Sequence, residues 1–178
     1  MTKTSIALIG FMATGKTTIG KILAAKLGDP YTHIEMDLLI EDFAGKSIPE
    51  IFSQDGEKKF RKLERLICKK VSKLDHSVIS CGGGVVLDER NVKDLRKNAI
   101  IIHLKSKLET IYKRIMNNGI NSRPVLDKTN FKEELKKIYE VRRSLYQKAA
   151  DFEVDTTDLD TNVIIKIILE KVMAAQKS

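Results

Sequence analysis

With 178 residues, the chain is long enough for one well-formed hydrophobic core but short for two, so we expect a single domain over residues 1–178. Hydrophobic residues make up 42% and charged residues 31%, a balance that argues against disorder. The longest apolar runs, such as Ile100–Ile102, fall far short of the ~20 residues that span a membrane. No apolar leader segment precedes the first predicted strand, so we expect a cytoplasmic protein without a membrane partner.

The net charge of +8 raises the question of a nucleic-acid partner. Most lysines lie next to acids in helical segments such as KKFRKLER and FKEELKK, which is typical of solvated helix faces. Aromatic residues make up only 6% of the chain and offer little surface on which bases could stack. We therefore favour solvated helices over nucleic-acid binding.

Strand-like segments alternate with helix-like segments along the whole chain. Strands are predicted at residues 5–10, 32–37, 76–82, 99–104 and 151–156. Helices are predicted at residues 17–28, 57–71, 88–97, 107–116, 131–150 and 161–175. Parallel neighbouring strands need crossover helices, so this alternation predicts an α/β fold with a parallel sheet of about five strands and helices on both faces. Ligands of such folds bind beyond the carboxyl ends of the strands.

The segment NNGINSRPVLDK, residues 117–128, interrupts this alternation. Gly119 and Pro124 break the helical pattern, and the residue before a proline is driven to an extended conformation. We expect this segment to form a mobile lid.

The stretch GFMATGKTT, residues 10–18, follows the first predicted strand and opens the first predicted helix. It fits the pattern G-x-x-x-x-G-K-[ST], in which backbone amides converge on phosphate and the lysine reaches the β and γ phosphates. The Thr17 hydroxyl is expected to bind Mg²⁺. The sequence thus predicts a P-loop nucleotide site made of Gly10, Ala13, Thr14, Gly15, Lys16, Thr17 and Thr18.

A P-loop alone leaves open a GTPase, an ATPase motor or a small-molecule kinase. The chain is short for most motors and carries no Asn-Lys-x-Asp guanine signature, which favours a kinase. In THIEMD, a strand would place Glu35 and Asp37 on one face, where a metal and an acceptor hydroxyl could lie. A pair of exposed strand-end acids is the alternative.

Two arginines occupy informative places on predicted helices. Arg61 and Glu64 are three residues apart and can pair, either as an ordinary surface pair or to steady an arginine that faces an anion. Arg142 completes an apolar stripe formed by Phe131, Leu135, Ile138, Leu145 and Ala149. A guanidinium there needs an anion, which either a protein carboxylate or a substrate supplies.

Three glycines, Gly82, Gly83 and Gly84, directly follow the third predicted strand. A tight turn needs one or two glycines, so three favour the close approach of a ligand to the backbone.

Together these motifs resemble the shikimate kinase family across almost the whole chain, through GFMATGKTT, MDLLIE, FRKLE, CGGGVV, SRPVL and RRSLY in order. The resemblance implies a three-layer α/β/α P-loop kinase that uses ATP and Mg²⁺ to phosphorylate the 3-hydroxyl of shikimate. It implies that shikimate is held by Asp37, Arg61, Gly83, Gly84 and Arg142, within a helical segment of about residues 37–65 and its surroundings. It also implies that Arg114 lies against adenine and that Arg123 closes with the lid, so that the catalytic residues are Lys16, Asp37 and Arg123.

One departure from the family is Glu35, where Asp-x-Asp is usual, so Glu35 is expected to reach the metal only indirectly. A related kinase, such as one for gluconate, is the rival within the same class of enzymes. A nucleotide-binding module without catalysis is the rival outside it, although Lys16, Asp37 and Arg123 are all intact. The resemblance further implies a monomer.

Overall fold

The computed structural model describes residues 3–118 and 130–176. Arg123 and nearly the whole predicted lid lie outside the described residues. In the described part of the chain, no helix is both long and apolar enough to cross a membrane.

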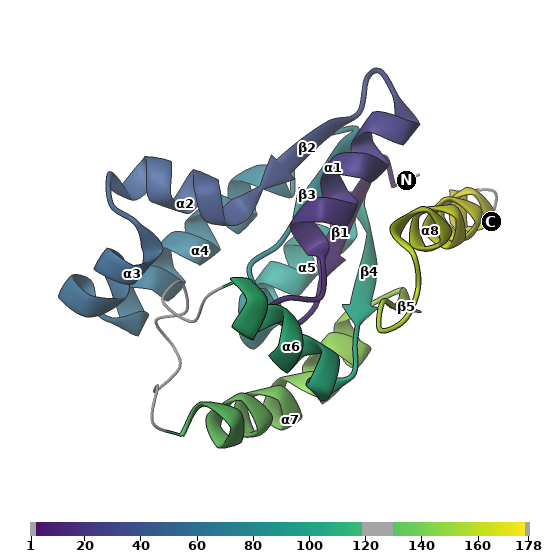
Figure 1. Ribbon diagram of the computed structural model, residues 1–178. Coiled ribbons are helices and arrows are strands. Elements are labelled where there is room, and N and C mark those ends of the chain that lie inside the picture. Colours follow the sequence, from purple (N-terminus) through teal and green to yellow (C-terminus); the bar gives the residue numbers. More distant parts are fainter. Residues whose placement is uncertain (1–2, 119–129, 177–178) are drawn as a thin grey trace.

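Five parallel strands form one sheet in the order β2-β3-β1-β4-β5 (Figure 1). The strands are β1 (Ser5–Ile9), β2 (Thr32–Glu35), β3 (Ser77–Ser80), β4 (Ala99–Lys105) and β5 (Phe152–Asp155). The central strand β1 pairs with β3 on one side and with β4 on the other, so that Ile6 lies between Val78 and Ile100. The chain adds β2 and β3 on one side of β1 and then β4 and β5 on the other side. In parallel α/β sheets, ligands bind at such a switch point, so a ligand crevice is expected beyond the carboxyl end of β1.

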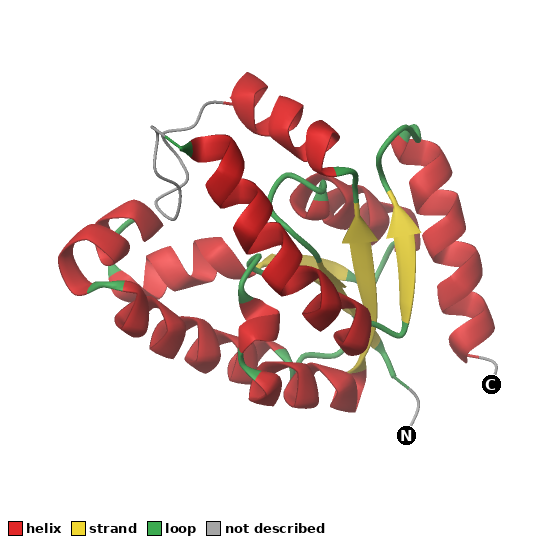
Figure 2. Ribbon diagram, turned by 90° about the horizontal axis from the view of Figure 1, so that it is seen from below, coloured by secondary structure: helices red, strands yellow, loops and turns green. Residues whose placement is uncertain are grey.

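Helices cover both faces of the sheet (Figure 2), which confirms the predicted α/β class. The helices are α1 (Lys16–Leu27), α2 (Met36–Ala44), α3 (Ile48–Glu50), α4 (Glu57–Val71), α5 (Glu89–Asn98), α6 (Leu108–Asn118), α7 (Phe131–Ala149) and α8 (Thr161–Gln176). A π-helical turn (Ile51–Asp55) follows α3, and a 3-10 turn (Val85–Leu87) follows β3. Helices α1 and α8 contact each other on one face of the sheet, whereas α5 and α7 pack against β4. Helices α2 and α3 extend to one side of the sheet (Figure 1).

The two faces of the sheet carry separate hydrophobic cores because side chains alternate along each strand. Leu8 and Ile102 pack with Leu23 of α1 and with the buried isoleucines of α8. On the other face, Ile9 and Ile101 belong to the core that α4, α5, α6 and α7 complete. Burial of each such side chain contributes roughly 1.5–3 kcal/mol. Because both faces are covered, the central strands appear in the sequence as continuous apolar runs.

The predicted strand over residues 32–37 is wrong at its carboxyl end. The strand β2 stops at Glu35 and α2 begins at Met36, so Glu35 and Asp37 do not share a strand face. Met36 and Ile40 are buried one helical turn apart, and their burial favours a helix over a continued strand. Asp37 instead occupies the first turn of α2, where the helix dipole favours a carboxylate.

Candidate active site

The phosphate loop connects β1 to α1 beyond the carboxyl edge of the sheet. Gly15 has φ 93° and precedes the first helical residue, a conformation that favours glycine. No side chain caps the start of α1, which leaves the amides of its first turn directed at a ligand. The Lys16 ammonium donates to the carbonyl oxygens of Gly10 at 2.9 Å and Phe11 at 2.8 Å, so it lies over the loop.

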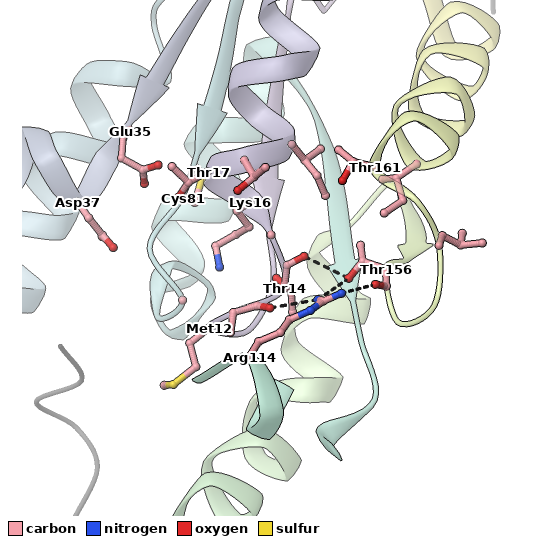
Figure 3. A pocket seen from close by; sticks show the side chains of 17 residues that line it. Met12, Thr14, Lys16, Thr17, Glu35, Asp37, Cys81, Arg114, Thr156 and Thr161 are labelled. Carbon is pink, nitrogen blue, oxygen red and sulfur yellow. Dashed lines mark hydrogen bonds between the residues drawn. The ribbon is translucent and has the colours of Figure 1, made fainter. Parts of the chain in front are cut away.

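A cavity of about 430 Å³ surrounds this loop, a size suited to a small-molecule ligand. Figure 3 shows Glu35 and Asp37 on one side of Lys16, and Arg114 and Thr156 on the other. Of the predicted nucleotide residues, the cavity is lined by Ala13, Thr14, Gly15, Lys16, Thr17, Thr18 and Arg114. The structure therefore brings the motif and the distant Arg114 together.

Arg114 lies against the phosphate loop and the segment that follows β5. Its guanidinium donates to the carbonyl oxygens of Ala13 at 3.2 Å and Thr156 at 2.6 Å (Figure 3). The buried Thr156 hydroxyl contacts the carbonyl oxygens of Thr14 at 3.2 Å and Lys105 at 3.1 Å. Thr156 thus joins three segments around the nucleotide cavity. Sequence reasoning missed this residue, although its place directly after the carboxyl end of a strand was a usable signal.

Glu35 and Asp37 bring negative charge to one side of this cavity. Burial raises the pKa of Glu35, and Asp37 raises it further, whereas a hydrogen bond from Thr17 and the charges of Lys16 and Lys21 oppose the rise. No group of the described chain donates a hydrogen bond to the buried Oε2 atom of Glu35. A carboxylate oxygen of this kind, next to the Thr17 hydroxyl, is a donor set that suits Mg²⁺.

A second cavity, of about 400 Å³, adjoins the first and shares Met12, Asp37 and Gly83 with it. Every residue that the sequence assigned to the acceptor lines it: Asp37, Arg61, Gly82, Gly83, Gly84 and Arg142. Glu64 from α4 and Phe52 from the π-helical turn also contribute. The two cavities together provide room for two ligands that meet near Asp37.

Arg61 and Glu64 form an ion pair of 2.8 Å on the wall of the second cavity, and Glu64 is only 1% exposed. The pair is therefore far more buried than an ordinary surface pair. Burial raises the pKa of Glu64, and the charge of Arg61 opposes that rise. Burial lowers the pKa of Arg61, but Glu64 and Glu57 outweigh it and leave that pKa raised, so the guanidinium stays charged.

The glycines after β3 leave space for these side chains. A Cβ atom on Gly82 would lie 2.9 Å from Oδ1 of Asp37, and one on Gly84 would lie 2.1 Å from Nη1 of Arg61. Both distances are shorter than any ordinary carbon contact, so the absence of a side chain at Gly82 and Gly84 leaves the space that Asp37 and Arg61 occupy here.

Arg142 is only 8% exposed, as its place in the apolar stripe of α7 predicted. Its guanidinium donates to the carbonyl oxygen of Gly83 at 3.2 Å, and no carboxylate of the described chain forms an ion pair with it. Tyr146, one turn further along α7, is 1% exposed, whereas the predicted Leu145 is only half-buried. Sequence reasoning missed Tyr146, although the spacing of four residues from Arg142 could have indicated it.

A P-loop next to a second, cationic small-molecule cavity, on a parallel α/β sheet, defines a P-loop phosphotransferase with a small acceptor. The family model described as shikimate kinase matches residues 12–173, so the chain belongs to the shikimate kinase family.

Relatives of known identity agree with this assignment. The chain is 38% identical over 167 residues to the shikimate kinase of Thermodesulfovibrio yellowstonii, which covers 94% of both chains. It is 42% identical over 154 residues to that of Caldanaerobacter subterraneus, covering 86% of this chain and 87% of the relative. Its fold matches the structure of shikimate kinase from Acinetobacter baumannii in complex with shikimate, with a TM-score of 0.90, 28% identity and coverage of 97% and 94%.

Proposed function

We propose that this protein transfers the γ-phosphate of ATP to the 3-hydroxyl of shikimate. The observation that carries the proposal is the second cavity, in which two arginines from different helices face one space beside the phosphate loop. A planar guanidinium pairs with a carboxylate through two parallel hydrogen bonds. Arg61 and Arg142 would therefore hold the carboxylate of shikimate, with backbone groups of the Gly82–Gly84 turn beside the ring.

ATP would occupy the first cavity. Its phosphates would accept hydrogen bonds from the amides of the phosphate loop, after Lys16 exchanges the carbonyl oxygens of Gly10 and Phe11 for phosphate oxygens. Arg114, held by Ala13 and Thr156, would contact the adenine. Arg123, outside the described residues, is proposed to reach the phosphates from the lid.

Magnesium fits the donors on the acidic side of the same cavity. Thr17 would bind the ion directly, and Glu35 would bind a water of its shell, because the buried Oε2 atom is available as an acceptor. The ion neutralises charge on the transferred phosphoryl group.

Asp37 lines both cavities, so its carboxylate can reach an acceptor hydroxyl that points towards the phosphate loop. We assign to Asp37 the orientation of the 3-hydroxyl and the acceptance of its proton. Phosphoryl transfer depends mainly on alignment and charge neutralisation, which Lys16, the loop amides and Arg123 would supply. The lid would exclude water that otherwise takes the phosphate.

The competing acceptors are tested by ADP release with ATP and Mg²⁺ in the presence of shikimate, gluconate or a nucleoside monophosphate. We expect shikimate alone to raise turnover well above background. ADP release with gluconate, but not with shikimate, would support the rival kinase. ATP binding without turnover on any acceptor would support the non-catalytic module.

The chain offers a matched pair of arginines for the carboxylate site. Arg142→Ala should raise the KM of shikimate by roughly 10- to 100-fold, because a charge-assisted hydrogen bond contributes about 1.5–3 kcal/mol. Arg143→Ala, at the exposed neighbouring position, removes the same charge and should leave that KM unchanged. Equal effects of the two variants would contradict the assignment of Arg142.

Three predictions made from the sequence remain predictions. We expect a monomer in the cytoplasm and no nucleic-acid partner. Sedimentation of the purified protein tests the first of these. Titration with duplex DNA at two salt concentrations tests the last, because nucleic-acid affinity falls steeply with salt.

A further inference from the structure

Gly83 occupies the boundary between the two cavities and lines both of them. A Cβ atom at this position would lie 3.6 Å from the amide nitrogen of Met12 and 3.8 Å from the carbonyl oxygen of Gly10. These are ordinary contact distances for an added methyl group, so the open side of Gly83 faces the phosphate loop. Gly83 thus lies where the two cavities meet.

The carbonyl oxygen of Gly83 accepts hydrogen bonds from two side chains of α7. Arg142 donates through Nη1 at 3.2 Å, and the hydroxyl of Tyr146 donates to the same oxygen. The two donors are four residues apart, so they project from the same face of the helix. This shared acceptor ties α7 to the glycine turn at the point where Arg142 enters the second cavity.

Tyr146 is itself held firmly in place. Its ring stacks on that of His103, with 5.0 Å between the ring centroids. The Nδ1 atom of His103 contacts Oε1 of Glu153 at 2.6 Å, and Lys105 pairs with the same carboxylate at 3.5 Å. Because β4 and β5 carry these residues, the hydroxyl of Tyr146 has a fixed position relative to the sheet.

We propose that Tyr146 is a positioning residue of the acceptor site. Its hydroxyl fixes the Gly83 carbonyl oxygen and, through it, the place of the Arg142 guanidinium. Tyr146 lines neither cavity, so it acts on the acceptor only through Gly83 and Arg142. This inference rests on the proposed function, since it assumes that shikimate occupies the second cavity.

Core packing alone is the competing explanation, because Tyr146 is among the largest fully buried side chains. A tyrosine that serves only packing would affect stability and would not distinguish one substrate from the other. Tyr146→Phe separates the two explanations, since it keeps the ring on His103 and removes only the hydroxyl, which donates to Gly83 and also lies beside the Arg142 guanidinium.

Tyr139→Phe is the matched control for this test. Tyr139 lies on the same helix, and its hydroxyl donates to the carbonyl oxygen of Ser106 at 3.3 Å and not to Gly83.

The test measures KM for shikimate, KM for ATP, kcat and the melting temperature of wild type and both variants. Tyr146→Phe should raise the KM of shikimate by about 3- to 10-fold, the loss expected for one hydrogen bond. The KM of ATP should rise by a smaller factor, because Gly83 also lines the nucleotide cavity whereas Arg142 lines only the acceptor cavity. Tyr139→Phe should leave both KM values unchanged. In an Arg142→Lys background the effect of Tyr146→Phe should shrink, because the two side chains act through one carbonyl oxygen.

Equal changes in both KM values, or an unchanged KM for shikimate, would overturn the inference. So would an undiminished effect in the Arg142→Lys background. A variant that melts near 25 °C is assayed at 10 °C with the same criteria. If the wild type does not phosphorylate shikimate, the proposed function fails; if it does and Tyr146→Phe behaves as wild type, only the positioning role fails.

Discussion

The substitution Gly84→Ala tests the geometry of the acceptor cavity with a single added methyl group. Gly84 has φ −105° and ψ 0°, which alanine can adopt, so the backbone itself is not strained. The added Cβ would lie 2.1 Å from Nη1 of Arg61 and 2.6 Å from its Cζ. Ordinary contact begins at 3.4 Å, so the guanidinium must retreat by more than 1 Å.

The expected rise in the KM of shikimate follows from the hydrogen bonds that Arg61 loses when it moves. Its hydrogen bond of 2.8 Å to Glu64 is lost or lengthened, and so is the proposed bond to the substrate carboxylate. One charge-assisted bond contributes about 1.5–3 kcal/mol, which corresponds to a roughly 10- to 100-fold rise in the KM of shikimate. The KM of ATP should stay within about twofold of the wild-type value, because Gly84 does not line the nucleotide cavity.

The assay is ADP release at varied shikimate and at varied ATP, with a melting curve for each variant. Gly45→Ala is the control: Gly45 has φ 64° and open space around it, so the substitution should cost roughly 1 kcal/mol of stability and leave both KM values unchanged. An unchanged KM for shikimate in Gly84→Ala would refute the placement of Arg61 in the acceptor site.

Three further predictions concern the nucleotide cavity and the stability of the fold. Thr156→Val should raise the KM of ATP several-fold and spare the KM of shikimate, with Thr156→Ser near wild type, since only the hydroxyl contacts the phosphate loop; parallel effects on both substrates would contradict this. Glu35→Gln should raise the Mg²⁺ concentration needed for half-maximal rate, and excess EDTA should abolish turnover in both proteins; an unchanged Mg²⁺ requirement would exclude Glu35 from the metal site. Hydrogen bonds from Lys97 and Arg65 lower the pKa of Asp94 to about 2. Asp94→Asn should therefore lower the free energy of unfolding by roughly 1 kcal/mol at pH 7, after allowance for solvent. In urea unfolding, the stability difference between wild type and Asp94→Asn should shrink as the pH falls from 3.8 towards 2, where the native carboxylate takes up its proton. A stability difference independent of pH would contradict the lowered pKa of Asp94.

The alternation of apolar runs with amphipathic segments was sufficient to predict the sheet and its helices. Buried strands such as Ile100–Ile102 have no polar face, and their length and spacing therefore carried the signal. The order of the strands was not predicted, because periodicity reports which face of an element is buried and not which element lies beside it. The boundary at Met36 was missed because residues 32–37 alternate as a strand does, whereas burial of Ile40 one turn later favours a helix.

Among the site residues, the phosphate loop and Arg142 could be predicted because each is unusual in its local sequence context. Glycines and a lysine at fixed spacing have few other uses, and a guanidinium in an apolar stripe requires an anion. Thr156 and Tyr146 are not unusual in this way, since a threonine after a strand and a tyrosine in a helix occur in many sequences. Their importance lies in contacts between distant segments, such as that of Thr156 with Thr14, which only the folded chain shows.

The most direct test of the proposed function is the identity of the product. The protein is incubated with ATP, Mg²⁺ and shikimate, and the product is examined by phosphorus NMR with proton coupling. We expect one phosphomonoester coupled to the proton on carbon 3 of the shikimate ring, formed in equal amount to ADP. Release of inorganic phosphate without a shikimate-dependent ester, or an ester at another hydroxyl, would contradict the placement of the 3-hydroxyl beside Asp37.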